Sequence, residues 1–144
     1  MATILQNRLL FAALIGWLCA QVSKTVIHLV STKTIDLRKL FSSGGMPSSH
    51  ASTVVALCGS AGIVYGLAST PFAISVTLAL VVMYDACGVR REAGRHARKL
   101  NALDDQLNHT DQKPQDPLKE FIGHTPSQVF AGAVLGLLVA ILFV

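Results

Sequence analysis

Two histidines lie in short motifs that are typical of helix starts. His50 ends the segment 44–50, GGMPSSH, and His124 stands in the segment 123–126, GHTP. Thr125 followed by proline is a favoured N-cap and first helical residue, so a helix is expected directly after His124. Free N–H groups and the dipole at a helix N-terminus favour an anion. Each motif alone is also an ordinary helix start, but together they predict an anion site served by two histidines.

Other residue types that suit a phosphate-like anion lie near these motifs. Glycine lets the backbone approach a ligand closely, serine hydroxyls donate hydrogen bonds, and lysine and arginine neutralise phosphoryl oxygens. The candidate anion-binding residues are Lys24, Gly45, Ser48, Ser49, Arg90 and Arg91. These six residues and the two histidines belong to the predicted site, together with Asp85 and Gln128, which are discussed below.

Asp85 is an acid about one turn inside an otherwise apolar segment. It could orient a histidine, pair with Lys24 or Arg90, or bind a metal together with His50 and His124. The ligand types would suit zinc, but no short ligand spacing supports a metal. We favour the ion pair and expect neither a metal nor another cofactor.

The composition places these residues in a membrane protein. Hydrophobic residues make up 51% of the 144-residue chain and charged residues 14%, against roughly 25% charged residues in soluble domains. Apart from Arg8, every Lys, Arg, Asp and Glu lies within residues 24–39 or 85–120. We therefore expect one membrane domain over residues 1–144, with the lipid bilayer as its surroundings and no nucleic-acid partner.

Four apolar segments are each about long enough to cross the roughly 30 Å hydrocarbon core as a helix. They span residues 9–27, 51–69, 72–89 and 126–144, and a break is expected at Thr70–Pro71. The predicted fold is an all-α bundle of four transmembrane helices. Two G-x-x-x-G spacings, Gly62–Gly66 and Gly132–Gly136, favour close helix packing within a compact bundle or in a homodimer.

The segment between the third and fourth spans predicts a further helix over residues 91–107. Its apolar residues recur every three or four positions and its basic residues occupy other faces. The apolar residues are Ala93, Ala97, Leu100, Leu103 and Leu107. This pattern predicts an amphipathic helix on the membrane surface, with its basic side chains toward lipid headgroups.

Counting spans puts the loops 28–50 and 90–125 on one side and both termini on the other. With Lys24 included, eleven of the twelve Lys and Arg residues fall on the loop side. Cytoplasmic loops carry this excess, so the loops and the site are expected to face the cytoplasm. By the same rule Arg90 and Arg91 could simply be anchors, and Lys24 could extend to the interface.

Three strings resemble a known family. They are GGMPSSH at 44–50, YDACGVRR at 84–91 and EFIGHTPSQV at 120–129. The chain resembles the divergent branch of the type 2 phosphatidic acid phosphatases, also described as acid phosphatase/vanadium-dependent haloperoxidase-related membrane proteins. The resemblance covers essentially the whole chain, from residue 20 to residue 132.

The resemblance implies roles for four residues. The parent superfamily uses the motifs K-x-x-x-x-x-x-R-P, P-S-G-H and S-R-x-x-x-x-x-H-x-x-x-D. Carried over, Lys24 is similar to the lysine of the first motif, which holds phosphate. His50 is similar to the general acid of the second. His124 corresponds to the histidine that becomes phosphohistidine, and Gln128 stands where an aspartate orients that histidine.

The chain departs from the superfamily at several motif positions. Ser31 and Thr32 replace the first Arg-Pro pair, Pro117 and Leu118 replace Ser-Arg, and Gln128 replaces the aspartate. Arg90, Arg91 and Asp85 are candidate replacements for the missing charges. Two functions stay open: a metal-independent histidine phosphatase acting on a lipid-linked phosphate monoester or diphosphate, and a weak or inactive relative that binds, transports or scaffolds a phosphorylated lipid.

Overall fold

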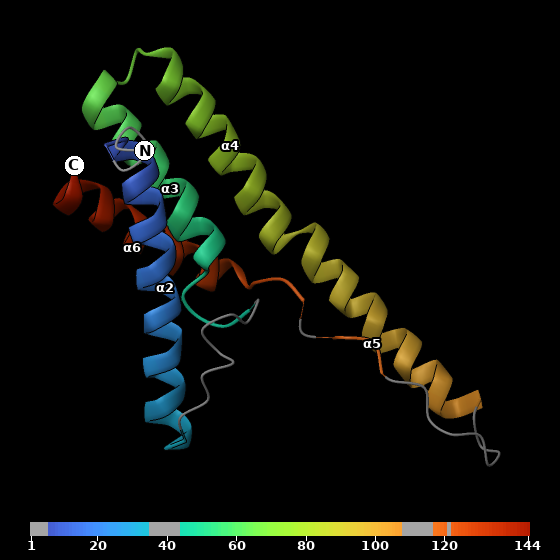
Figure 1. The fold of residues 1–144 in the computed structure, drawn as a ribbon. Coiled ribbons are helices and arrows are strands. Elements are labelled where there is room, and N and C mark those ends of the chain that lie inside the picture. Colours follow the sequence, from blue (N-terminus) through green and yellow to red (C-terminus); the bar gives the residue numbers. More distant parts are fainter. Residues whose placement is uncertain (1–5, 35–43, 108–116, 121) are drawn as a thin grey trace.

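The computed structural model describes residues 6–34, 44–107, 117–120 and 122–144. Over these residues the chain is helical and contains no strand, which confirms the all-α prediction (Figure 1). The helices in chain order are α2 (Arg8–Thr32), α3 (Ser49–Tyr65), α4 (Thr70–Cys87), α5 (Val89–Leu107) and α6 (Pro126–Phe143).

Helix α2 begins at an Asn7 cap, whose side chain accepts hydrogen bonds from the backbone N–H groups of Leu9 and Leu10. It ends at Lys33, which has a positive φ of 55°. The helix therefore runs five residues beyond the predicted span 9–27. Polar residues end an apolar segment, but they do not end a helix, because the backbone hydrogen bonds continue through them.

The break between α3 and α4 differs from the predicted one at Thr70–Pro71. Helix α3 ends at Gly66, which has a φ of 84°, and Ser69 caps α4 by accepting the N–H of Phe72. Pro71 lies in the first turn of α4. Proline suits that turn because its fixed φ is helical and its missing N–H would have no partner there.

Helix α3 is the central element and packs against α2, α4 and α6. Missing Cβ atoms permit this packing. A Cβ on Gly16 of α2 would lie 2.9 Å from the backbone oxygen of Ser52, and one on Gly132 or Gly136 of α6 would overlap the backbone oxygen of Ser48 or Ser52. The Gly132–Gly136 spacing is thus used inside the chain, so a homodimer would need another face.

The Gly62–Gly66 spacing has a different role. A Cβ on Gly62 would meet the side chains of Leu67 and Phe72, and one on Gly66 would meet nothing within 4 Å. Gly66 ends α3 with a backbone conformation that favours glycine. This second G-x-x-x-G therefore serves a turn rather than a pair of helices.

Among the described residues, three helical segments are long and apolar enough to cross a membrane. They are α2, the run Thr70–Leu107 that contains α4, and α6. Helix α3 is apolar but has only 17 residues, about 25 Å at 1.5 Å per residue. Large apolar side chains cover the outside of the molecule, among them Ile74, Phe130 and Leu142. The protein is an integral, multi-pass membrane protein.

Helix α5 continues α4 after Gly88 in nearly the same direction, away from the other helices (Figure 1). It covers the predicted amphipathic helix 91–107 and begins two residues earlier. Leu100, Leu103 and Leu107 are exposed, whereas Ala97 is buried. The helix itself is confirmed, and its position on the membrane surface stays a prediction.

The predicted site residues lie at only one end of the helical bundle. The start of α2 lies beside the end of α3, where Arg8 and Tyr65 line the same small pocket, and α6 also ends toward this side (Figure 1). The starts of α3 and α6 and the junction of α4 with α5 lie toward the other end. The predicted site residues gather there.

Candidate functional site

His124 is positioned by the junction between α4 and α5. Its backbone N–H donates to the carbonyl oxygen of Ala86 at 2.9 Å. The preceding Gly123 has a φ of 93°, and a Cβ there would lie 2.6 Å from the backbone nitrogen of Arg91. Only glycine tolerates both the conformation and the contact. His124 is therefore held against α4 and α5 although it precedes α6 by two residues.

Gln128 fixes the orientation of the His124 ring. Its side-chain oxygen lies 3.2 Å from Nδ1 of His124 and accepts the backbone N–H of Thr125 at 3.1 Å. The Thr125 hydroxyl in turn accepts the Gln128 N–H at 3.4 Å, which completes a capping box. Because a backbone N–H can only donate, the Gln128 oxygen faces it, and Nδ1 is assigned the proton. Nε2 of the neutral ring is then left with its lone pair.

His50 lies in the first turn of α3, with its ring centroid 5.7 Å from that of His124 and an interplanar angle of 62°. Its Nδ1 is buried and has no hydrogen-bond partner within the described residues. A buried polar atom without a partner is costly. A ligand or a water molecule at this point would relieve that cost.

Lys24 extends from α2 into the site rather than to the surface. The residue is 5% exposed, and its ammonium donates to the side-chain oxygen of Gln21 at 2.9 Å and to the Ser49 hydroxyl at 3.1 Å. A Cβ on Gly45 would lie 4.0 Å from Cγ of Lys24. Both hydrogen-bond partners of this buried cation are neutral, so an anion beside it would be stabilised.

The two serines of the 44–50 motif have different contacts. Ser49 bonds Lys24, whereas Ser48 is fully buried and caps α3 by accepting the N–H of Ala51 at 3.4 Å. The Ser48 backbone N–H donates to the carbonyl oxygen of Gln128 at 3.0 Å. Ser48 thus ties the start of α3 to the start of α6, and this tie brings the two histidines together.

Asp85 pairs with Arg90, as the favoured interpretation of the sequence had it. The Arg90 Nε donates to the carboxylate at 2.7 Å, and both side chains are partly exposed. Nδ1 of His124 has Gln128 as its partner, so the orienting role lies with the amide. In the described parts of the chain, no group of three His, Cys, Asp or Glu side chains is placed to hold a metal ion.

A pocket of about 700 Å³ opens beside His124. Gln128, Lys24 and Gly45 line it, together with Arg91 from α5. Arg95 and Arg98 also line it, and the sequence analysis did not assign them to the site. Arg91, Arg95 and Arg98 have the spacing i, i+4 and i+7, which places three cations on one face of a helix. This spacing in the sequence could have predicted that all three line the same site.

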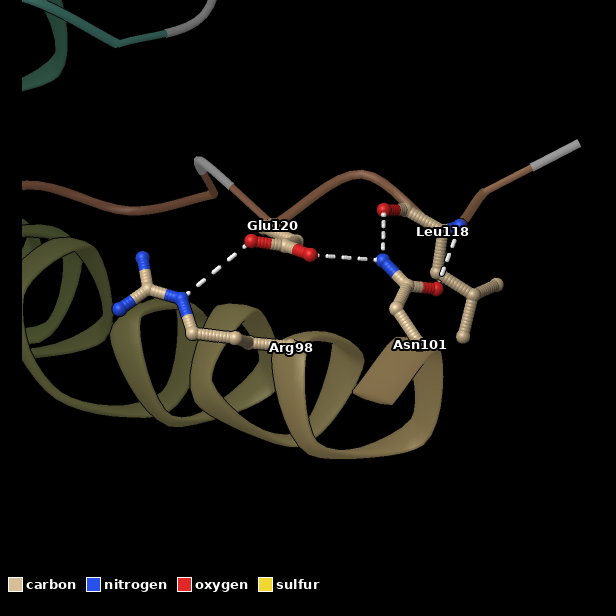
Figure 2. A network of polar contacts seen from close by, with 4 residues as sticks. All are labelled: Arg98, Asn101, Leu118 and Glu120. Carbon is tan, nitrogen blue, oxygen red and sulfur yellow. Dashed lines mark hydrogen bonds and ion pairs between the residues drawn. The ribbon is translucent and has the colours of Figure 1, made fainter. Parts of the chain in front are cut away.

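A short strap, residues 117–120 and 122–123, runs along α5 and leads to His124. Figure 2 shows how Asn101 holds it: the side chain accepts the N–H of Leu118 at 2.9 Å and donates to the Leu118 carbonyl at 3.0 Å. Asn101 also donates to one carboxylate oxygen of Glu120 at 2.9 Å, and Arg98 donates to the other at 3.3 Å. A Cβ on Gly94 would overlap the Glu120 carbonyl oxygen.

The electrostatics of the strap and of His124 follow from these contacts. The hydrogen bond from Asn101, aided by Arg98, lowers the pKa of Glu120, which is therefore ionised. Burial lowers the pKa of His124, and the positive charges of Lys24 and Arg90 act in the same direction against the Gln128 hydrogen bond. His124 is thus neutral at pH 7, the form in which imidazole is a nucleophile.

Comparison with known proteins agrees with the architecture and the motifs. The profile of the divergent PAP2 family matches residues 5–139. The chain is 36% identical over 149 residues to a protein of Bacillus subtilis (strain 168), described as the uncharacterized membrane protein YuiD. The alignment covers 96% of this chain and 94% of that protein. No solved structure matches the chain at a significant level.

Proposed function

Because the chain belongs to the divergent PAP2 family, we propose that it is a membrane-embedded phosphatase that hydrolyses a lipid-linked phosphate through a phosphohistidine on His124. One observation carries the proposal. The Gln128 oxygen, itself held by the Thr125 N–H, directs the proton of His124 to Nδ1 and leaves Nε2 free to attack phosphorus.

The chemical steps balance with the residues in place. Nε2 of His124 forms a bond to phosphorus as the bond between phosphorus and the leaving oxygen breaks. His50, whose ring faces that of His124, gives a proton to the leaving oxygen. A water molecule then attacks the phosphohistidine, His50 takes a proton from it, and inorganic phosphate leaves. No cofactor enters these steps.

The transferred phosphoryl group carries charge that the site must stabilise. This negative charge would be stabilised by Lys24, by Arg91 and by the backbone N–H groups at the start of α3. Removal of one such donor typically costs about 10²–10³-fold in rate. Ser49 positions the Lys24 ammonium. Arg90 acts at longer range, because its guanidinium is bound to Asp85.

The proposed arrangement in the membrane has four spans, with α3 as a short span enclosed by α2, α4 and α6. One transmembrane unit, residues 1–144, would then present the site at the lipid–water boundary, where a phosphorylated lipid headgroup lies. Because cytoplasmic loops carry an excess of Lys and Arg, the proposed orientation has this boundary on the cytoplasmic side and both termini opposite. Modification of Ser69→Cys and Lys119→Cys by an impermeant thiol reagent from opposite sides tests this arrangement.

A second candidate function rests on Gln128. An amide orients imidazole but cannot offset the positive charge that develops on it, and replacement of the orienting aspartate by an amide costs roughly 10⁴-fold in a serine-protease triad, where the tautomer of the histidine changes as well. A site with this weakness suits a protein that binds or transports a phosphorylated lipid without turnover.

Phosphate release by the purified protein in detergent, over a panel of lipid phosphates, separates the two functions. We expect vanadate-sensitive release that is lost in His124→Ala and in His50→Ala. His96→Ala is the matched control, because His96 is exposed on α5 and does not line the pocket. Binding of lipid phosphate without release by the folded protein would establish the second function.

A further inference from the structure

The pocket extends well beyond the position of a phosphoryl group at His124. It measures about 700 Å³ and continues along α5 past Arg91 to Arg95 and Arg98. These two arginines are not needed to hold a phosphoryl group between Lys24 and His124. Their position on the same helix face suggests a second group of negative charge in the same ligand.

The charges that line this part of the pocket are mainly positive. Lys24, Arg91, Arg95 and Arg98 contribute cations, and Glu120 contributes a carboxylate. Arg95 is also paired with Glu92, which does not line the pocket, at 2.7 Å. Guanidinium groups bind phosphate oxygens through two parallel hydrogen bonds, which makes arginine suited to a phosphoryl group. Three arginines on one helix face can surround such a group.

Glu120 already places a carboxylate against this face of α5. One of its carboxylate oxygens lies 3.3 Å from Nε of Arg98 and the other is held by Asn101 (Figure 2). A carboxylate on an arginine is the contact that a phosphoryl oxygen would make. Glu120 thus occupies, within the chain itself, a position suited to an anionic ligand.

We propose that Arg95 and Arg98 form a second anion subsite, with Arg91 between the two phosphoryl groups, so that the pocket takes a diphosphate and Glu120 competes for Arg98. The inference rests on the proposed function. The terminal phosphoryl group lies at His124 and the inner one at the arginines. His124 attacks the terminal phosphorus, the bridging P–O bond breaks, and the lipid monophosphate leaves with its electron pair and a proton from His50. Water then releases inorganic phosphate from His124.

Binding tests the subsite without turnover. Calorimetry of His124→Ala in detergent compares inorganic pyrophosphate with inorganic phosphate, and we expect pyrophosphate to bind about tenfold more tightly. Arg95→Gln and Arg98→Gln, each in this background, should lower pyrophosphate affinity about tenfold and leave phosphate affinity unchanged. Lys99→Gln is the matched control, because Lys99 is an exposed cation of α5 outside the pocket lining.

The Glu120→Gln substitution should raise the affinity for pyrophosphate, whereas the arginine substitutions lower it. Glutamine keeps an oxygen for Asn101 but removes the charge that competes for Arg98, so pyrophosphate affinity should rise several-fold. Misfolding cannot produce a gain of affinity. Equal affinities for phosphate and pyrophosphate, or a loss of pyrophosphate affinity in Glu120→Gln, would overturn the proposal.

Two lipids with the same chain, one a monophosphate and one a diphosphate, distinguish this inference from the phosphatase proposal. Hydrolysis of both with equal kcat/KM refutes the second subsite and leaves the phosphatase. Pyrophosphate preference without hydrolysis of either lipid refutes the phosphatase and keeps the subsite. Free pyrophosphate as the better substrate would identify a soluble ligand in place of a lipid.

Discussion

The side-chain oxygen of Gln128 lies 3.2 Å from Nδ1 of His124, and the same oxygen accepts the backbone N–H of Thr125. Gln128 occupies the third position of α6, where glutamine or glutamate completes a capping box. One side chain therefore caps a helix and orients the proposed nucleophile. The geometry of the nucleophile depends on how α6 begins.

A glutamate at position 128 should raise the rate. Gln128→Glu keeps the capping box and adds the charge that stabilises a positive His124, so we expect phosphate release to increase at least about tenfold. Gln128→Leu removes the hydrogen bond and should lower release below that of the wild type. The measurement is the initial rate with one lipid phosphate at saturation. A lower rate in Gln128→Glu would contradict the proposed role of this side chain.

The pH dependence of the reaction should reflect the lowered pKa of His124. The ordinary pKa of histidine is about 6.5, and burial moves that of His124 downward. The neutral, nucleophilic form therefore prevails at pH 7, and kcat/KM should fall on the acid side as pH passes below that lowered pKa. Gln128→Glu should raise the pKa and move this acid limb to higher pH. The kcat/KM profiles of both proteins check this, and an acid limb that stays in place would refute the assignment.

The stability of the folded protein should also decrease at acid pH, because the pKa of His124 is lowered in the folded state. Below pH 6.5 the unfolded chain takes up a proton at position 124 before the folded chain does, so the free energy of unfolding falls as pH falls. His124→Asn should reduce this dependence. Thermal unfolding in detergent between pH 5 and pH 8 measures it, and an unchanged slope in His124→Asn would show that other groups dominate.

Lys24→Met should separate binding from folding. The substitution removes a buried charge whose partners are neutral, so we expect little loss of stability. Loss of charge-assisted hydrogen bonds to a phosphoryl group costs about 1.5–3 kcal/mol, or about 10–100-fold in affinity. Vanadate binding and the melting temperature are the two measurements. Lys33→Met is the control, because Lys33 is exposed beyond the end of α2. Unchanged vanadate affinity in Lys24→Met would place the anion elsewhere.

Gly136→Ala should destabilise the bundle despite the higher helix propensity of alanine. Propensity favours alanine by about 1 kcal/mol, whereas overpacking costs about 1–3 kcal/mol. Here the added Cβ would overlap the backbone oxygen of Ser52, which cannot move aside as a side chain can. We expect a lower melting temperature and weaker vanadate binding. Leu138→Ala, on the exposed face of α6, should leave vanadate binding unchanged. A stable Gly136→Ala protein would refute this packing of α3 and α6.

Hydropathy and short motifs in the sequence were sufficient to predict most of the helices and part of the site. Hydropathy located the apolar helices, and the helix-start motifs located the N-termini of α3 and α6. His124 and Gln128 are four residues apart, so a helix starting at Pro126 nearly fixes their relation. Apolar length predicts the ends of a membrane span and not the ends of a helix, so α2 and α3 end at other residues than the predicted spans. Proline predicts a break at Thr70–Pro71, but Pro71 lies in the first turn of α4.

The sequence by itself determined which residues form the helices, which end carries the charge and which histidines stand at helix starts, because these depend on contacts a few residues apart. Only the tertiary structure decided that Lys24 bonds Ser49 and that the arginines of α5 line the pocket of His124. It also decided that Gly132 and Gly136 pack within the chain. Such pairings join separate helices, and they depend on how closely the backbones approach, which no local pattern specifies.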